Sequence, residues 1–144
     1  MGILNLFNNP GVKPEADTTP KITILVAEDD QYIRDFYQEL LTEKGYQIIT
    51  AANGQESLNL ASQKLPQLIL LDIMMPVMDG NEVLSKLWDN ELTRKIPVIV
   101  LTNAGNIENM DKAKFYNAFK FMIKSNVAPE EILKTVEEAL QQNK

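Results

Sequence analysis

Five polar side chains stand directly after short apolar runs in this sequence, and together their types could perform phosphoryl chemistry. They are two neighbouring acids, a third acid, a hydroxyl and an amine: Glu28, Asp29, Asp72, Thr102 and Lys124. Carboxylate oxygens suit Mg²⁺, which prefers oxygen ligands and keeps several of its waters. A lysine ammonium and a threonine hydroxyl can each donate to a phosphoryl oxygen. A carboxylate can itself accept the phosphoryl group, and Asp72 is the candidate acceptor.

The runs in front of these side chains predict parallel β-strands. Each run is short, apolar and rich in β-branched or aromatic residues, as is typical of strands that helices cover on both faces. The predicted strands are residues 22–27, 68–71, 98–101 and 119–123, with 47–50 as a shorter strand of edge type.

Amphipathic segments alternate with these strands. Apolar residues at helical spacing predict helices around residues 33–41, 58–65, 83–87, 107–114 and 132–140. Asp30 is the expected N-cap of the first helix, Gly45 its expected C-terminal stop, and Pro129 the expected start of the last. The chain thus reads as five β/α units, and right-handed crossovers turn such a series into a doubly wound parallel sheet.

This architecture explains why separated residues could form one site. In open α/β sheets, ligands bind beyond the carboxyl ends of the strands, at the point where the strand order reverses. Taken singly, Asp72 could be a cap or turn residue, Thr102 a loop hydroxyl and Lys124 a solvated charge. Their convergence favours a functional site, because the ordinary explanation must account for each coincidence separately.

Four sequence blocks resemble the signatures of response-regulator receiver domains of two-component signalling. In chain order they are Ile24-Leu25-Val26-Ala27-Glu28-Asp29-Asp30, Leu70-Leu71-Asp72-Ile73-Met74-Met75-Pro76-Val77-Met78-Asp79-Gly80, Pro97-Val98-Ile99-Val100-Leu101-Thr102 and Ile123-Lys124. The resemblance runs over about residues 21–142, and the block containing Asp72 is highly specific. It implies a flavodoxin-like α/β fold, with a five-stranded parallel sheet in the order 2-1-3-4-5 and helices on both faces.

The resemblance also implies a role for each residue of the site. Asp72 would be the phospho-acceptor, and Glu28 and Asp29 would be the acidic pair that organises Mg²⁺. The main-chain carbonyl of Met74 would be a further metal ligand, and Lys124 would pair with the phosphoryl group.

Two further residues would form a switch. Thr102 would move toward the phosphoryl group on activation. Phe121 would couple that movement to the surface formed by the fourth helix, fifth strand and fifth helix. Such a protein is a signalling switch and not an enzyme in the ordinary sense, since it catalyses only its own phosphoryl transfer and dephosphorylation.

Three positions depart from the family pattern. Met74, two residues after the acceptor, offers no amide or carboxylate to hold a hydrolytic water, which predicts slow intrinsic dephosphorylation. Asn103 stands where a small residue is usual and is expected to alter the phosphorylation rates. Ser125 stands where the family most often has proline, which leaves open whether the peptide after Lys124 is cis.

Composition excludes several other chemistries. The 144 residues contain no Cys and no His, so thiol nucleophiles, imidazole bases and a phosphohistidine within this sequence are absent. The expected phosphoryl donor is therefore a partner sensor histidine kinase or histidine phosphotransfer protein, or a small acyl phosphate. The expected output is binding to an effector protein of unknown identity. The net charge of −6 argues against direct nucleic-acid binding.

The ends of the sequence predict its organisation. Residues 8–20 contain three prolines and no hydrophobic period, so residues 1–20 are expected to be a flexible tail or linker and 21–144 the receiver domain. No apolar run approaches the roughly 18 residues of a membrane span, and no basic signal-peptide region precedes the short apolar start. The expected location is the cytoplasm.

Three alternative functions fit the sequence less well than a phosphorylated receiver does. An aspartyl-phosphate phosphatase of the haloacid dehalogenase type wants Asp-x-Asp, whereas Met74 stands two residues after Asp72. A flavodoxin-like cofactor carrier wants a Ser/Thr/Gly-rich loop after the first strand, where acids stand instead. The third alternative is a degenerate receiver that acts as a phosphorylation-independent binding module, against which the intact acceptor, acids and lysine argue.

Overall fold

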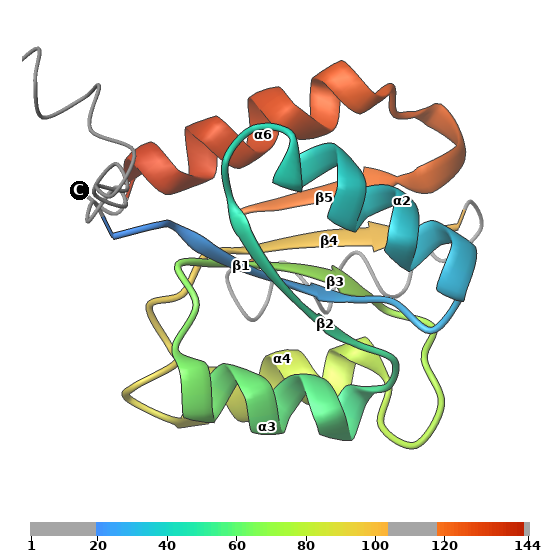
Figure 1. Cartoon of the computed structure of the whole chain (residues 1–144). Helices are drawn as coiled ribbons and strands as arrows, with labels where there is room; N and C mark the ends of the chain where they lie inside the picture. Colours follow the sequence, from blue (N-terminus) through green and yellow to red (C-terminus); the bar gives the residue numbers. More distant parts are fainter. Residues whose placement is uncertain (1–19, 104–117, 143–144) are drawn as a thin grey trace, which may run out of the picture.

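The computed structural model describes residues 20–103 and 118–142 and is built around one parallel sheet (Figure 1). Its five strands lie in the order β2-β1-β3-β4-β5. In chain order they are β1 Thr23–Ala27, β2 Gln47–Ala51, β3 Leu68–Asp72, β4 Val98–Thr102 and β5 Lys120–Ile123. The strand order and the parallel pairing confirm the predicted fold.

Helices cover both faces of this sheet. In the described ranges they are α2 Gln31–Thr42, α3 Gly54–Lys64, α4 Gly80–Asp89 and α6 Pro129–Gln142, with a short 3-10 helix η1 Lys124–Asn126. None of these helices is long and apolar enough to cross a membrane. The predicted helix at 107–114 and the predicted tail at 1–20, except its last residue, lie outside the described residues, so both stay predictions.

The bounds of the strands differ from the predicted ones by one residue, and two of these differences matter. Asp72 and Thr102 are the last residues of β3 and β4, whereas the sequence placed them just after the strands. The reason is register, because Asp72 pairs with Leu101 and Thr102 pairs with Ile123. Both side chains are therefore held by the sheet and not by a loop.

Alternation along the strands builds two hydrophobic cores, one beneath the helices on each face of the sheet drawn in Figure 1. Leu25, Ile69 and Val100 belong to the core that packs against α3 and α4. Their neighbours Ile24, Leu70 and Leu101 belong to the core that packs against α2 and α6. The strands β1, β3 and β4 are buried on both faces, which explains their continuous apolar runs.

Side-chain caps begin the helices next to the carboxyl end of the sheet. The Asp30 carboxylate accepts hydrogen bonds from the amides of Tyr32 and Ile33, which confirms it as the N-cap of α2. Asp79 caps α4 in the same way by accepting from the amide of Glu82. These caps satisfy amides that have no partner within their helices and so fix where each helix starts.

Two glycines let the loop after Asp72 pack closely against its surroundings. A Cβ atom at Gly80 would lie 2.6 Å from the main-chain oxygen of Asp72 and 2.7 Å from Cα of Ile73. A Cβ atom at Gly54 would overlap the main-chain carbonyl of Met78. The amide of Gly80 also donates to the carbonyl of Ile73 at 2.8 Å. The close approach at Gly80 thus bears directly on the position of Asp72.

We predict that Gly80→Ala destabilises the protein by about 1–3 kcal/mol, because the new methyl group meets main-chain atoms that cannot move aside. In an unobstructed helix the same change would stabilise the protein by up to about 1 kcal/mol. The sign of the change in the free energy of unfolding therefore distinguishes the two cases. Urea unfolding followed by circular dichroism measures the effect. Ser62→Ala, on the exposed face of α3, is the control and should be neutral or slightly stabilising. A Gly80→Ala protein as stable as wild type would contradict the prediction.

Candidate functional site

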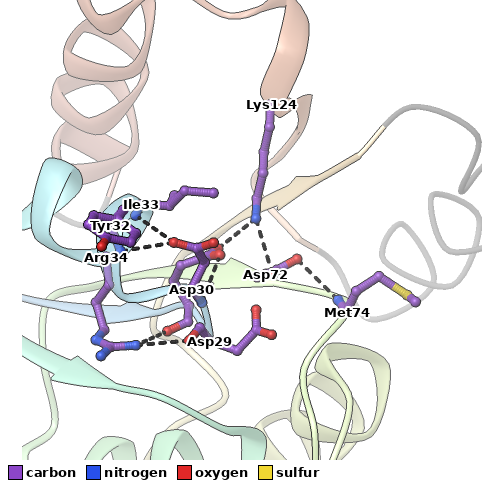
Figure 2. A network of polar contacts seen from close by, with 9 residues as sticks. Asp29, Asp30, Tyr32, Ile33, Arg34, Asp72, Met74 and Lys124 are labelled. Carbon is purple, nitrogen blue, oxygen red and sulfur yellow. Dashed lines mark hydrogen bonds and ion pairs between the residues drawn. The ribbon is translucent and has the colours of Figure 1, made fainter.

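Three charged side chains from three separate strand ends meet beyond the carboxyl edge of the sheet, and Figure 2 labels two of them, Asp72 and Lys124. Lys124 Nζ lies 2.6 Å from Glu28 Oε2 and 3.1 Å from Asp72 Oδ2. Glu28 follows β1, Asp72 ends β3 and Lys124 follows β5. The structure therefore brings together three of the residues that the sequence singled out.

The alternation of the strands explains why these three side chains meet. Each stands two positions after a residue of the core under α2 and α6, namely Val26, Leu70 and Met122. Side chains at i and i+2 of a strand point to the same face. Glu28, Asp72 and Lys124 consequently continue the apolar rows of one face beyond the point where the apolar core ends.

Burial dominates the electrostatics of the two carboxyl groups. Glu28 is 2% exposed and Asp72 is 5% exposed. Burial raises the pKa of Glu28 to about 7, with a further increase from the charge of Asp72, while the hydrogen bond from Lys124 opposes the rise. Burial also raises the pKa of Asp72, against the charge of Lys124 and the hydrogen bond from the Met74 amide. One ammonium therefore does not fully balance two buried carboxylates.

Lys124 keeps its charge in this setting. Burial on its own would lower the pKa of its ammonium group, but the hydrogen bond from Lys124 to Glu28 and the charges of both carboxylates outweigh that effect and raise it. The side chain is 12% exposed and so holds a fixed positive charge against Asp72.

A third acid completes a cluster that fits a divalent cation. Glu28, Asp29 and Asp72 each offer a carboxylate oxygen, and these oxygens lie within 4.8 Å of one another. Asp29 is exposed while the other two are buried, so the cluster opens to solvent on one side. Carboxylate oxygens with room for waters are the donor set that Mg²⁺ prefers. Burial raises the pKa of both Glu28 and Asp72, so it disfavours their charged forms, which a bound cation would favour.

The loop after Asp72 contributes a main-chain donor. The Met74 amide donates to Asp72 Oδ1 at 3.1 Å (Figure 2), and the Met74 side chain is 54% exposed. Met74 is thus placed beside Asp72 by its main chain. The metal-binding role of its carbonyl stays a prediction.

The two predicted switch residues belong to the other face of the sheet. Thr102 is 1% exposed and stands two positions after Val100, which belongs to the core under α3 and α4. Phe121 pairs with Val100 across β4 and β5 and packs, half-buried, against the same core. Thr102 ends β4, the strand next to the one that ends at Asp72, and Phe121 lies one strand further away on β5. Their switching roles stay predictions.

Asn103 and Ser125 are exposed at the same end of the sheet. Asn103 directly follows β4 and Ser125 lies in η1. The described residues contain no cis peptide bond, which answers the question left open after Lys124. The effect of Asn103 on reaction rates stays a prediction.

Two residues of α2 lie at the site although the sequence did not assign them to it. The Arg34 side chain donates through Nη1 to the main-chain oxygens of Glu28 and Asp29. Tyr37 is buried, and burial raises the pKa of its hydroxyl, with smaller effects from the charges of Lys124 and Glu28. Arg34 had a local signal, since a cation in the first turn of a helix opposes the helix dipole and calls for a partner. Tyr37 had none, because it fits the apolar stripe of its helix.

Comparison with known proteins identifies the family and agrees with the fold. The model of the family described as "Response regulator receiver domain" matches residues 24–137. The structure is similar to a CheY-like response regulator receiver domain protein from Methanospirillum hungatei, with 28% identity, a TM-score of 0.80 and coverage of 85% of this chain and 96% of that one. It is also similar to the signal receiver domain of a signal transduction histidine kinase from Syntrophus aciditrophicus, with 29% identity, a TM-score of 0.77 and coverage of 83% and 90%.

A curated relative covers a similar part of the chain. It is the "Probable transcriptional regulator ycf29" of Pyropia yezoensis, which is 36% identical over 113 residues, or 78% of this chain and 50% of that protein. The chain spans about half or less of the length of the curated relatives it matches first.

The raised pKa of Glu28 predicts how stability depends on pH in the absence of divalent cations. The folded state binds the Glu28 proton more tightly than the unfolded chain, so the stabilisation is complete below about 4.5 and is lost as the pH rises through about 7. Asp72 acts in the same direction. We expect the free energy of unfolding in EDTA, measured with urea, to fall between about pH 5 and pH 8.

Glu28→Gln tests the assignment, because glutamine has a similar shape and does not titrate. The slope between about pH 5 and pH 8 should become clearly smaller in this variant, leaving the contribution of Asp72. A wild-type profile that rises with pH over this window, or a variant profile as steep as that of wild type, would speak against burial as the controlling effect.

Proposed function

The chain belongs to the response regulator receiver domain family, and from that premise we propose that it is a signalling switch phosphorylated on Asp72 in a Mg²⁺-dependent reaction. One observation carries the proposal. Asp72 is buried at the end of β3, 3.1 Å from Lys124 and within 4.8 Å of two further acids. The carboxylate thus lies between a fixed ammonium and a group of oxygens suited to a divalent cation.

The reaction uses the groups that surround Asp72. A carboxylate oxygen of Asp72 forms a bond to phosphorus, the bond from phosphorus to the donor breaks, and the leaving group keeps that electron pair. Glu28, Asp29, Asp72 and the main-chain carbonyl of Met74 would hold Mg²⁺, which would supply positive charge to the phosphoryl oxygens. Lys124 donates to one of these oxygens and offsets the charge that builds up in the transition state.

The Thr102 hydroxyl is proposed to donate to the phosphoryl group after transfer. Its displacement would change the packing of Phe121, which shares a face of the sheet with Thr102. A cavity of about 250 Å³ beside β5 and α6 is lined in part by Phe121, Val127 and Glu131. We propose that an effector protein binds at the surface around this cavity and there distinguishes the phosphorylated from the unphosphorylated protein.

The donor is proposed to be a phosphohistidine of a sensor histidine kinase or a histidine phosphotransfer protein. The 144 residues contain no histidine, so the donor lies outside them. A receiver domain similar to this chain comes from a signal transduction histidine kinase, which supports the pairing. The proposal places the protein in the cytoplasm as a switch and not as an enzyme, without direct contact to nucleic acid, in line with the net charge of −6.

The proposal predicts a Mg²⁺-dependent adduct on Asp72. Incubation with acetyl phosphate should add one phosphoryl group to wild type, as seen in the intact mass, and none in EDTA. Asp72→Asn should stay unmodified, because an amide is not a nucleophile here. Asp79→Asn is the matched control, since asparagine caps a helix as well as aspartate does. Equal modification of Asp72→Asn and wild type would refute the proposal.

Met74 predicts a long lifetime for the phosphoryl group. Its thioether side chain, exposed beside Asp72, cannot orient a hydrolytic water, whereas an amide at this position can. Met74→Asn should therefore speed dephosphorylation roughly tenfold, as expected from about 1.4 kcal/mol, the size of one hydrogen bond.

The decay of the phosphorylated mass after removal of acetyl phosphate measures this rate. Val77→Asn adds the same amide to an exposed position of the same loop and should leave the rate unchanged. A Met74→Asn protein that decays no faster than wild type would show that this side chain does not limit hydrolysis.

A further inference from the structure

The side chain of Arg34 ties together the turn that presents two of the three clustered acids. We propose that Arg34 is a positioning residue for the cation site: it holds the main chain of the β1–α2 turn so that Asp29 is presented to Asp72. This inference rests on the proposed function, because it concerns the cation that phosphorylation would use. It assigns a task to a residue outside the four sequence blocks that identify the family.

The geometry of the turn supports this role. Arg34 Nη1 donates to the Glu28 carbonyl at 2.8 Å and to the Asp29 carbonyl at 3.2 Å (Figure 2). One nitrogen of a half-buried guanidinium thereby links two consecutive peptide groups. These peptide groups follow Glu28 and Asp29, the two neighbouring candidates for metal binding. Their orientation therefore sets the directions in which the two acidic side chains point.

The turn needs such a donor because the sheet ladder ends before it. Pairing of β1 with both neighbouring strands stops at Ala27, and the Glu28 amide makes one more bond, to the Ala51 carbonyl at 3.0 Å. Past that point the Asp30 carboxylate accepts hydrogen bonds from main-chain amides of α2, but it cannot donate to main-chain carbonyls. Arg34 donates to those carbonyls instead. The turn is thus held from two sides by side chains of opposite charge.

Asp29 depends on this arrangement more than its neighbours do. Glu28 is buried and contacts Lys124, and Asp72 contacts both Lys124 and the Met74 amide. Among the described residues, none donates a hydrogen bond to the Asp29 carboxylate, which is exposed. Its place in the cluster is therefore set by its main chain, and Arg34 is the side chain that binds its carbonyl.

A role in stability alone explains this contact less well. The start of α2 already has its Asp30 cap, and the helix is anchored by the buried side chains of Tyr37 and Leu41. Removing Arg34 leaves these interactions in place. The loss should therefore appear in the affinity for the cation, since groups that orient ligands typically change metal affinity about 10–100-fold when they are removed.

Calorimetric titration with Mg²⁺ tests the inference in the full chain without any phosphoryl donor. Arg34→Met removes the donors and the charge but keeps an unbranched side chain, and it should weaken Mg²⁺ binding by about tenfold or more. Arg94→Met is the matched control. Arg94 also donates to a main-chain oxygen, that of Trp88 at 2.7 Å, but it lies before β4, at the opposite end of the sheet. This control should bind Mg²⁺ as wild type does.

Arg34→Lys separates position from charge. Lysine keeps the positive charge but lacks the planar guanidinium that links the two carbonyls. We expect this variant to bind Mg²⁺ several-fold more weakly than wild type while its urea unfolding midpoint in EDTA stays close to that of wild type. If Arg34→Met does not fold cooperatively, the Mg²⁺ affinity of Arg34→Lys alone tests the positioning role.

Each outcome is decisive. Wild-type affinity in Arg34→Met overturns the inference, and wild-type affinity in Arg34→Lys assigns the effect to charge and overturns the positioning role. Equal weakening in Arg34→Met and Arg94→Met also overturns it, because the effect is then not local. A wild-type protein that binds no Mg²⁺ overturns the proposed function together with this inference, whereas normal Mg²⁺ binding unaffected by Arg34 overturns this inference alone.

Discussion

Burial of two carboxyl groups beside a single ammonium is the constraint on which the rest of the structure depends. Glu28 and Asp72 are almost fully covered, and Lys124 contacts both. An isolated buried charge costs several kcal/mol, so this group is tolerable only where the three side chains meet within contact distance. They come from the ends of β1, β3 and β5, and the parallel sheet with the order β2-β1-β3-β4-β5 brings these ends to one edge. The sheet, its crossovers and the caps of α2 and α4 can be understood as the means of holding that contact.

This arrangement places two carboxyl groups beside one ammonium group, and the chemistry of the site follows from that difference in charge. Burial raises the pKa of Glu28 to about 7 and that of Asp72 as well, so proton binding and cation binding would compete at this site. A phosphoryl group on Asp72 would in turn meet the ammonium of Lys124 and the same cation. Local conflicts of this kind, in an otherwise consistent fold, are expected at functional sites. The proposed cation binding and phosphorylation would thereby be coupled to folding through one set of charges, and the proposed role of Arg34 would add control of the main-chain geometry.

Much of this could be predicted from the sequence, and the limits have physical causes. Continuous apolar runs followed by polar residues predicted the buried strands and the edge at which the site lies, and the Asp30 cap was confirmed. Local pattern could not predict that Asp72 and Thr102 would be the last residues of their strands, because register depends on partners far along the chain. The same holds for Lys124 and Glu28, which are 96 residues apart. A cation near the start of a helix signals that Arg34 needs a partner, but its partners are main-chain carbonyls, which no side-chain motif identifies.

The most direct test of the account is to locate the phosphoryl group chemically. Borohydride reduces an aspartyl phosphate to homoserine, which tandem mass spectrometry can place at a single position. After treatment with acetyl phosphate and Mg²⁺, the account predicts homoserine at residue 72 and unmodified Glu28 and Asp29, with no conversion when Mg²⁺ is replaced by EDTA. Conversion at another acid in place of Asp72, or conversion at Asp72 that does not require Mg²⁺, would contradict the account.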